Sequence, residues 1–191
     1  MSVKAVFFDR DDTLNYDPGY LGDPSKVELY NGVPEGISIL KNDLNFKIIV
    51  ISNQSGIARN LITEPEVNSV NNRINELLSN YSTKIDAFYF CPHHPEFSEK
   101  PCNCRKPSPE MVFKAASDYN IDLKSSYFVG DKISDVECGN NAGVKTVLVT
   151  TTIKESERLL LQNQGKTPNF VADNFLDACN IIAKDSTGGN V

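Results

Sequence analysis

Short apolar runs recur along the chain and are separated by stretches of mixed polarity. The clearest cover residues 5–8, 47–51, 87–90 and 127–129, and a further run covers 146–149. Each run is too short for a helix and is typical of a buried strand. Residues 170–172 form a candidate sixth strand.

Apolar residues between these runs follow helical spacing. A first helix is expected to bury Val33, Ile37, Leu40 and Leu44. A second is expected to bury Val67, Val70, Ile74, Leu77, Leu78 and Tyr81. Thr63 and Glu66 would form its capping box, and Ser108 with Pro109 would cap a third helix over 110–119. Strands that alternate with helices predict an α/β fold with a doubly wound, mostly parallel sheet.

Two long loops interrupt this alternation, at residues 15–31 and 91–106. Loops of this length in a compact domain are usually functional. Neither is long enough to be a large cap domain, so we expect an open site and a small substrate. The length of 191 residues suits one domain, which we place at 1–184, followed by a flexible tail at 185–191.

Composition narrows the function classes. The net charge of −6 argues against a nucleic-acid-binding protein, because no basic stripe offsets it. No apolar stretch approaches the ~20 residues of a membrane-spanning helix, and the N-terminus does not resemble a signal peptide. We therefore expect a cytoplasmic protein without membrane or nucleic-acid partners, and we expect a monomer.

A pair of acidic residues directly follows the first predicted strand. Asp9 and Asp11 are separated by one residue, so in an extended backbone their side chains would point the same way. Two neighbouring carboxylates repel each other unless a cation or a shared proton lies between them. A polar turn after a strand is the structural alternative for this pair alone.

Three further polar segments are expected at the same edge of the sheet. Residues 52–56 follow the second strand, 105–107 precede a helix N-terminus, and 130–135 follow the fourth strand. In open α/β sheets, ligands bind beyond the carboxyl ends of the strands, and helix N-termini favour anions. A turn serine, a solvated lysine or a capping aspartate could explain each segment alone. Together with the acidic pair, they predict a phosphate-handling active site.

The residue types at this edge predict magnesium-dependent phosphoryl transfer. Asp9 is expected to attack phosphorus and form an aspartyl-phosphate. Asp11 is expected to donate a proton to the leaving group and later to accept one from water. Magnesium is a hard cation, and Asp9, the backbone carbonyl of Asp11, and Asp131 would bind it.

Three more side chains complete this hypothesis. Ser52 and Lys106 are expected to hold the phosphoryl oxygens, where negative charge spreads in the transition state. Asp135 would lie behind the metal ligands and orient Asp131 or a metal-bound water.

The 91–106 loop contains three of the five cysteines and both histidines. A Cys₃His set typical of structural zinc is formed by Cys91, His93, Cys102 and Cys104. Incidental thiols are the alternative, whereas a cytoplasmic location disfavours disulfides. A complete set of four ligands leaves no open position, so zinc would be structural and would fix the loop that carries Arg105 and Lys106. His94 would be spare, in a stacking or solvent contact.

The four polar segments resemble the motif set of the haloacid dehalogenase superfamily of phosphohydrolases, over residues 6 to about 149. The zinc loop narrows the resemblance, because 52–59, 91–95 and 104–107 look like the bacterial D-glycero-D-manno-heptose-1,7-bisphosphate 7-phosphatases. Histidinol-phosphate phosphatase shares the zinc loop and is the alternative. Residues 15–21 resemble the substrate loop of the heptose enzymes better.

The resemblance implies that the 7-phosphate of D-glycero-D-manno-heptose 1,7-bisphosphate is removed, in nucleotide-heptose biosynthesis, with catalytic magnesium and structural zinc. It further implies that this small phosphorylated sugar is contacted by Asp17, Pro18, Gly19, Tyr20, Ser52, Asn53, Gln54, Ser55, Arg105, Lys106 and Lys132. Arg105 would suit a second phosphate or sugar hydroxyls, because its planar fork makes paired hydrogen bonds.

Three features depart from the family pattern. Asp12 and Asn60 stand where the family usually has glycine, and Asp12 adds a negative charge beside the metal. The segment between His93 and Cys102 is short for the heptose enzymes, which favours histidinol phosphate.

Two hypotheses belong to other function classes. An inactive, phosphate-binding regulatory domain is opposed by the intact Asp9, Asp11, Lys106 and Asp131. A zinc module for nucleic acid is opposed by the net charge and by the placement of both histidines in one loop.

Overall fold

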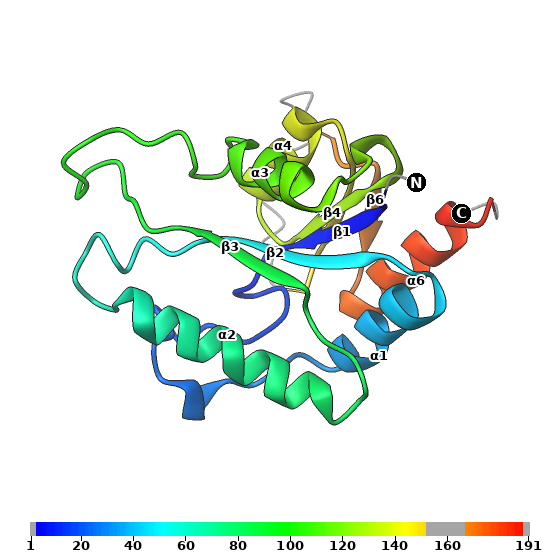
Figure 1. The fold of residues 1–191 in the computed structure, drawn as a ribbon, viewed down its shortest axis with the longest axis horizontal. Coiled ribbons are helices and arrows are strands. Elements are labelled where there is room, and N and C mark those ends of the chain that lie inside the picture. The colour runs from blue at the N-terminus through cyan, green and yellow to red at the C-terminus, as the bar shows by residue number, and fades with distance from the viewer. Residues whose placement is uncertain (1–2, 152–166, 189–191) are drawn as a thin grey trace.

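The computed structural model describes residues 3–151 and 167–188. A six-stranded parallel sheet with the strand order β3-β2-β1-β4-β5-β6 forms the centre of this part of the chain (Figure 1). The strands are β1 (Ala5–Phe8), β2 (Lys47–Asn53), β3 (Ala87–Cys91), β4 (Tyr127–Gly130), β5 (Lys145–Val149) and β6 (Phe170–Ala172). All the strands predicted from apolar runs are present, and the parallel arrangement is confirmed.

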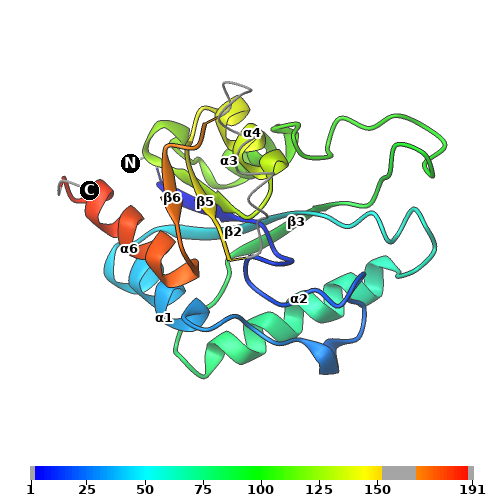
Figure 2. The ribbon, with the colours of Figure 1, turned by 180° about the vertical axis from the view of Figure 1, so that it is seen from behind.

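Helices cover both faces of the sheet, as Figures 1 and 2 show. The longer ones are α1 (Val33–Ser38), α2 (Glu64–Ser79), α3 (Glu110–Tyr119), α4 (Ile133–Ala142) and α6 (Phe175–Ser186). The helix α1 continues directly into the π-helical turn η2 (Ile39–Asp43), and the 3-10 turns are η1 (Pro24–Lys26) and η3 (Leu123–Ser125). One face carries α1, α2 and α6, whereas the other carries α3 and α4. The fold is therefore doubly wound.

Alternation along β1 explains how the sheet joins two cores. Val6 and Phe8 are buried among residues of α1, α2 and α6. Ala5 and Phe7 are buried among residues of α3 and α4 on the opposite face. Strand residues point to opposite faces in turn, and because both faces are apolar, β1 is fully buried at the centre of the molecule.

Some predicted boundaries are wrong by a few residues. The capping box of α2 is confirmed, since the backbone N–H of Thr63 donates to Glu66 Oε2 at 2.7 Å. Tyr81, however, lies beyond the end of α2 and its side chain is exposed. Pro109 is itself the N-cap of α3, and Ser108 lies one position outside it. Strand β2 extends to Asn53 because Ser52 and Asn53 pair with β3.

The predicted flexible tail starts too early. The helix α6 runs through Ser186, and Asp185 accepts hydrogen bonds from the Tyr127 hydroxyl and from Lys145 Nζ. These contacts attach the end of α6 to β4 and β5, so residues 185 and 186 belong to the fold. Residues 189–191 of the predicted tail lie outside the described residues. Within the described ranges, no helix is long and apolar enough to cross a membrane.

Candidate active site

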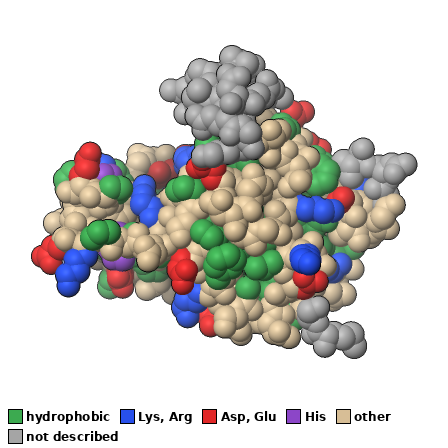
Figure 3. All heavy atoms as spheres, turned by 90° about the horizontal axis from the view of Figure 1, so that it is seen from above, with side chains coloured by type: hydrophobic (Ala, Val, Ile, Leu, Met, Phe, Trp, Pro, Cys, Tyr) green, Lys and Arg blue, Asp and Glu red, His purple; other side chains and the backbone are tan. Residues whose placement is uncertain are grey.

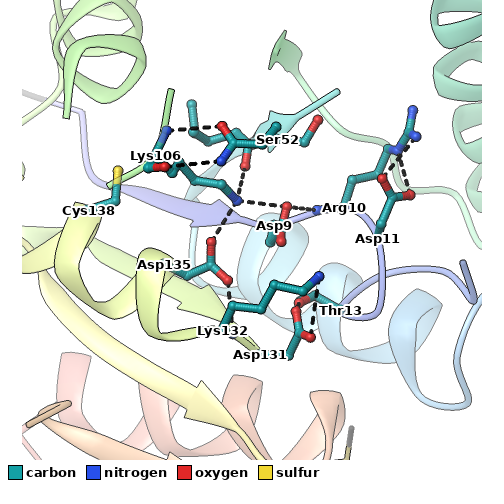
Figure 4. Close-up of polar contacts among 12 residues, drawn as sticks. Asp9, Arg10, Asp11, Thr13, Ser52, Lys106, Asp131, Lys132, Asp135 and Cys138 are labelled. Atoms are coloured by element: carbon teal, nitrogen blue, oxygen red, sulfur yellow. Dashed lines mark hydrogen bonds and ion pairs between the residues drawn. The ribbon is translucent and has the colours of Figure 1, made fainter. Parts of the chain in front are cut away.

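Three buried carboxylates meet at the carboxyl ends of β1 and β4, which are neighbours in the sheet (Figure 4). Asp9 follows β1, Asp131 follows β4, and Asp135 lies in the first turn of α4. Their ligand oxygens all lie within 4.8 Å of one another, and each residue is at most 5% exposed. Gly130 permits the close approach of α4, because a Cβ there would lie 2.4 Å from Asp135 Cβ. Buried negative charge at this density needs a cation.

Lys106 supplies one of the compensating positive charges. Its Nζ lies 2.8 Å from Asp9 Oδ1 and 2.6 Å from Asp135 Oδ1, and it donates to the Ile51 carbonyl at 2.9 Å. Burial alone would lower the pKa of Lys106, but the charges of Asp135 and Asp9 outweigh burial and raise the pKa above its usual value. Lys106 is therefore held as a cation against the acidic cluster.

The amide of Asn53 fixes the backbone of Lys106. Its Nδ2 donates to the Lys106 carbonyl at 3.2 Å, and its Oδ1 accepts from the Lys106 N–H at 3.0 Å. The pair of hydrogen bonds ties the 91–106 loop to the end of β2. Because Asn53 also borders the site cavity, its side chain has a positioning task that sequence reasoning missed.

Asp9 has an unusually high pKa for an aspartate. Burial is the largest cause, the negative charge of Asp135 adds to it, and Lys106 opposes it only in part, so the pKa rises to about 6. The N–H of Arg10 donates to Asp9 Oδ1 at 2.8 Å and orients the carboxylate. A cation bound beside Asp9 would lower this pKa again.

Asp11 lies in a separate hydrogen-bonded arrangement. Its carboxylate lies 3.0 Å from Arg10 Nε, and it also accepts from Gln54 Nε2 at 2.7 Å and from Asn15 Nδ2 at 3.2 Å. Burial acts to raise the pKa of Asp11, but Arg10 and these donors outweigh it and lower the pKa. The chain turns directly after Asp11, where Asp12 has φ 64°.

Arg10 and Thr13 support the site in ways that sequence reasoning did not assign. Arg10 is fully buried, and beyond Asp11 it donates from Nη1 to Asn71 Oδ1 at 3.1 Å. Thr13 donates from its hydroxyl to Asp131 Oδ1 at 2.9 Å. Neither role could be predicted from the sequence. A charged residue such as Arg10 after a strand is ordinarily expected to be exposed, and the partner of Thr13 lies 118 residues away.

A cavity of about 300 Å³ opens beside Asp9 and Lys106. It is lined by Asp9, Asp11, Asp17, Gly19, Tyr20, Asn53, Gln54, Ser55, Arg105, Lys106, Lys132 and Ser134. The structure therefore brings together all of the expected substrate-contacting residues except Pro18, which is exposed, and Ser52, which is buried and accepts from Gln54 at 3.2 Å. Ser134 was not predicted.

The four predicted zinc ligands also converge. Ligand atoms of Cys91, His93, Cys102 and Cys104 lie within 4.8 Å of one another. The sulfur of Cys91 lies 3.6 Å from that of Cys102 and 3.1 Å from that of Cys104, distances too long for disulfide bonds of about 2.05 Å. His93 Nδ1 lies 3.4 Å from the Cys104 sulfur. The cluster can hold a metal ion, and Figure 3 shows the histidines at the end of the molecule that this loop forms.

Comparisons with known proteins agree with this geometry. Residues 103–178 match a family model described as HAD-hydrolase-like. The D-glycero-D-manno-heptose-1,7-bisphosphate 7-phosphatase of Chlorobaculum tepidum is 39% identical over 187 residues, which cover 93% of this chain and 92% of that protein. The D-glycero-β-D-manno-heptose-1,7-bisphosphate 7-phosphatase of Yersinia pestis is 40% identical over 158 residues, or 80% of this chain and 83% of the other. This chain belongs to the heptose-1,7-bisphosphate 7-phosphatase family.

A solved structure of a family member supports the fold. The D,D-heptose 1,7-bisphosphate phosphatase of B. bronchiseptica, complexed with magnesium and phosphate, superposes with a TM-score of 0.82 at 26% identity. The match covers 96% of this chain and 99% of the other. The predicted haloacid dehalogenase-like fold and the predicted phosphatase class are both confirmed.

Both departures from the family's glycines occur at left-handed backbone positions. Asp12 has φ 64° and Asn60 has φ 57°, a region that glycine occupies without strain and that Asn and Asp tolerate better than most residues. Lys132 Nζ lies 3.6 Å from Asp12 Oδ2 and 3.7 Å from Asp131 Oδ2. The extra negative charge of Asp12 therefore has a cationic neighbour.

The raised pKa of Asp9 gives an expected pH dependence for magnesium binding. The carboxylate must lose its proton to bind a cation, and its pKa without metal is about 6. Below that pH, we expect the magnesium dissociation constant to rise about tenfold per pH unit, with little change above about pH 7. Calorimetric titration in buffers of different ionisation enthalpy would measure the proton released. An Asp9→Asn variant that kept the same slope would assign the proton to another group.

Proposed function

We propose that this protein removes the 7-phosphate of D-glycero-D-manno-heptose 1,7-bisphosphate through an aspartyl-phosphate formed on Asp9. One observation carries the proposal: Asp9, a member of the buried acidic cluster, lines a cavity together with Lys106, and two further cations, Arg105 and Lys132, line it as well. Such a cavity can receive one phosphate at the nucleophile and a second at the rim. Family membership supports the choice of sugar.

The residues present fit a magnesium ion. Asp9 and Asp131 offer carboxylate oxygens from adjacent strands, and the backbone carbonyl of Asp11 is the proposed third ligand. Oxygen donors suit this hard cation. When bound, magnesium would neutralise charge on the phosphoryl oxygens and on Asp9. Thr13 supports the site by fixing the orientation of Asp131 through its hydroxyl.

In the first half-reaction, an Asp9 carboxylate oxygen attacks phosphorus as the bond to the sugar oxygen breaks. The departing oxygen takes a proton from Asp11, which yields the sugar alcohol and an acyl phosphate on Asp9. The pKa of Asp11 is lowered in the free enzyme, and an arriving phosphate would raise it because like charges repel.

In the second half-reaction, a water attacks the phosphorus of the acyl phosphate. Asp11, now ionised, accepts a proton from this water. The bond between phosphorus and the Asp9 oxygen breaks, which regenerates the carboxylate and releases inorganic phosphate. Lys106, which lines the cavity, would hold equatorial oxygens in both steps. The 2.6 Å contact between Asp135 and Lys106 supports a revised role for Asp135, the placement of this lysine.

Arg105 is the proposed ligand of the remote 1-phosphate. It lines the cavity, and its Nη1 donates to the His93 carbonyl at 3.3 Å, which leaves the rest of its fork for an anion. Arg105→Ala is expected to lower kcat/KM for the bisphosphate by about ten- to a hundredfold. The same substitution should change kcat/KM for simple phosphate esters little. Steady-state kinetics on both substrate types, with Arg73→Ala on α2 as control, would measure this.

The choice of substrate and phosphate is tested on the wild-type enzyme. Phosphorus NMR of the product should show that the anomeric phosphate remains on the sugar. Release of the anomeric phosphate, or a higher kcat/KM for histidinol phosphate, would contradict the substrate assignment and leave the aspartyl-phosphate chemistry standing.

We also propose that the Cys₃His cluster holds structural zinc, for which its four converging thiol and imidazole groups are the support. Free thiols agree with a cytoplasmic location. Cys102→Ser is expected to remove about one zinc per chain, to lower the unfolding temperature and to raise KM, because the loop carrying Arg105 loosens. Elemental analysis and thermal unfolding would measure these effects, with Cys179→Ser, buried in the other core, as control. A variant with wild-type stability and KM, and a wild type without zinc, would refute this assignment.

A further inference from the structure

Arg59 is a half-buried arginine that none of the proposed catalytic steps uses. It lies on the loop between β2 and α2 and does not line the active-site cavity. Its Nη2 lies 2.8 Å from His94 Nε2, whereas its Nε is buried with no hydrogen-bond partner among the described residues. A buried, unpaired donor costs stability. Folding stability alone therefore does not explain an arginine here.

The guanidinium of Arg59 lies between aromatic rings of two different loops. Its Cζ is 4.8 Å from the centroid of the Phe97 ring and 5.9 Å from the centroid of the Tyr20 ring. A cation within about 6 Å of a ring centroid is attracted to the face of the ring. Phe97 belongs to the 91–106 loop, and its ring also meets His94 edge-on at 5.0 Å. Tyr20 belongs to the 15–31 loop and lines the active-site cavity.

The backbone around Arg59 brings these loops close together. Ala58 N–H donates to the Pro92 carbonyl at 3.1 Å, which joins the loop after β2 to the 91–106 loop. Figures 1 and 2 show the loop after β2 and the 91–106 loop extending side by side beyond the sheet. A Cβ on Gly56 would lie 2.7 Å from Tyr20 Cδ1, so the tyrosine ring packs directly on this loop. Tyr20 itself has φ 56°, an uncommon conformation that its surroundings must maintain.

We propose that Arg59 is a positioning residue that joins the Tyr20 segment to the loop carrying Arg105, and so fixes the rim that receives the remote part of the substrate. This role rests on the proposed function. Arg59 does not contact the acidic cluster, so its loss should weaken substrate binding more than it slows the chemical step. The expected signature is a raised KM with a nearly unchanged kcat.

The proposal is tested by comparing a large and a small substrate in the Arg59→Leu variant. The KM for the heptose bisphosphate should rise about tenfold, and kcat should stay within about twofold of wild type. Turnover of p-nitrophenyl phosphate, which is too small to engage the rim fully, should stay within about twofold. The KM of Arg59→Lys should lie between those of the wild type and Arg59→Leu, because lysine keeps a cation near the rings but loses the planar fork. Arg73→Leu, on the exposed face of α2, is the matched control.

Combining the Arg59 and Tyr20 substitutions distinguishes a positioning role of Arg59 from general destabilisation of the fold. In a Tyr20→Leu background, Arg59→Leu should add less than about twofold to KM, because the contact is already lost. Hydrogen exchange of the 17–21 and 94–99 amides should be faster in Arg59→Leu than in wild type, a result that needs no substrate. If Arg59→Leu does not fold, Arg59→Lys in both backgrounds gives the same comparison at smaller amplitude.

The outcomes distinguish the two proposals. A wild-type enzyme that does not hydrolyse the bisphosphate would refute the proposed function, whatever the exchange data show. An unchanged KM with unchanged exchange in Arg59→Leu would overturn the role of Arg59. Equal losses on the bisphosphate and on p-nitrophenyl phosphate would overturn it as well, since they would place Arg59 in the chemical step or in overall stability.

Discussion

Asp9→Asn is expected to abolish phosphate release, with kcat lower by at least ~10⁴-fold. An amide is a poor nucleophile toward phosphorus and a poor magnesium ligand, so both functions of Asp9 are lost at once. The fold should persist, because Lys106 keeps its ion pair with Asp135 and the repulsion between two buried carboxylates is removed. Phosphate release and thermal unfolding of the same preparation would measure the two effects.

Two controls strengthen this comparison. Asp118→Asn makes the same chemical change on the exposed side of α3, where the carboxylate contacts Tyr89 and Lys114, and it should leave kcat unchanged. Intact-mass analysis of Asp9→Asn should exclude deamidation back to aspartate. Turnover within about a hundredfold of wild type in a verified sample would remove Asp9 from the nucleophile role.

Asp11→Asn is expected to lower kcat by about 10²–10⁴-fold, because proton transfer in both half-reactions is lost. With p-nitrophenyl phosphate, whose leaving group needs no proton, the first half-reaction should remain faster than the second. The aspartyl-phosphate should then accumulate, and rapid mixing should show a burst of about one p-nitrophenolate per active site. A variant that turns over at nearly the wild-type rate would assign proton transfer to another group.

The same substitution should also destabilise the protein. Arg10 is fully buried, and Asp11 lies 3.0 Å from its Nε. Neutralising Asp11 leaves the guanidinium buried without this counter-charge, although asparagine keeps an acceptor oxygen, and we expect a loss of about 2 kcal/mol in the free energy of unfolding. Chemical denaturation would measure it. The kinetic burst and the stability loss are separate readouts, so a folding defect cannot be mistaken for lost proton transfer.

The spacing of apolar residues and the positions of the strand ends predicted the sheet and the edge at which the candidate site lies. Residues of β1 alternate between two apolar cores, so a short run such as 5–8 already indicates a strand buried on both faces. Parallel strands place their carboxyl ends at one edge of the sheet, which is why Asp9 and Asp131 could be grouped from the sequence alone. Lys106 could be added because it precedes a helix N-terminus expected at the same edge. The Cys₃His spacing likewise indicated four groups that do converge.

Contacts between segments far apart in the sequence could not be predicted in this way. Asp135 was expected to orient Asp131 or a metal-bound water, and its ion pair with Lys106 was not predicted, because the approach of the loop to α4 cannot be read from either segment. The hydrogen bonds between the Asn53 amide and the Lys106 backbone could not be predicted for the same reason. Arg10 was assigned no role from the sequence, and in the structure its guanidinium is fully buried against Asp11 and Asn71.

The central position of β1 also governs when activity can arise during synthesis. Thr13 and its partner Asp131 are separated by 118 residues, and β1 lies between β2 and β4 in the sheet. A nascent chain can pair β1 with β2 early, but one edge of β1 stays open until β4 has been made, and contacts this distant form late. Asp9, the proposed nucleophile, therefore cannot have Asp131 beside it until residue 131 of 191 has been synthesised. If Asp131 holds the metal as proposed, products of premature termination before that point are expected to be inactive.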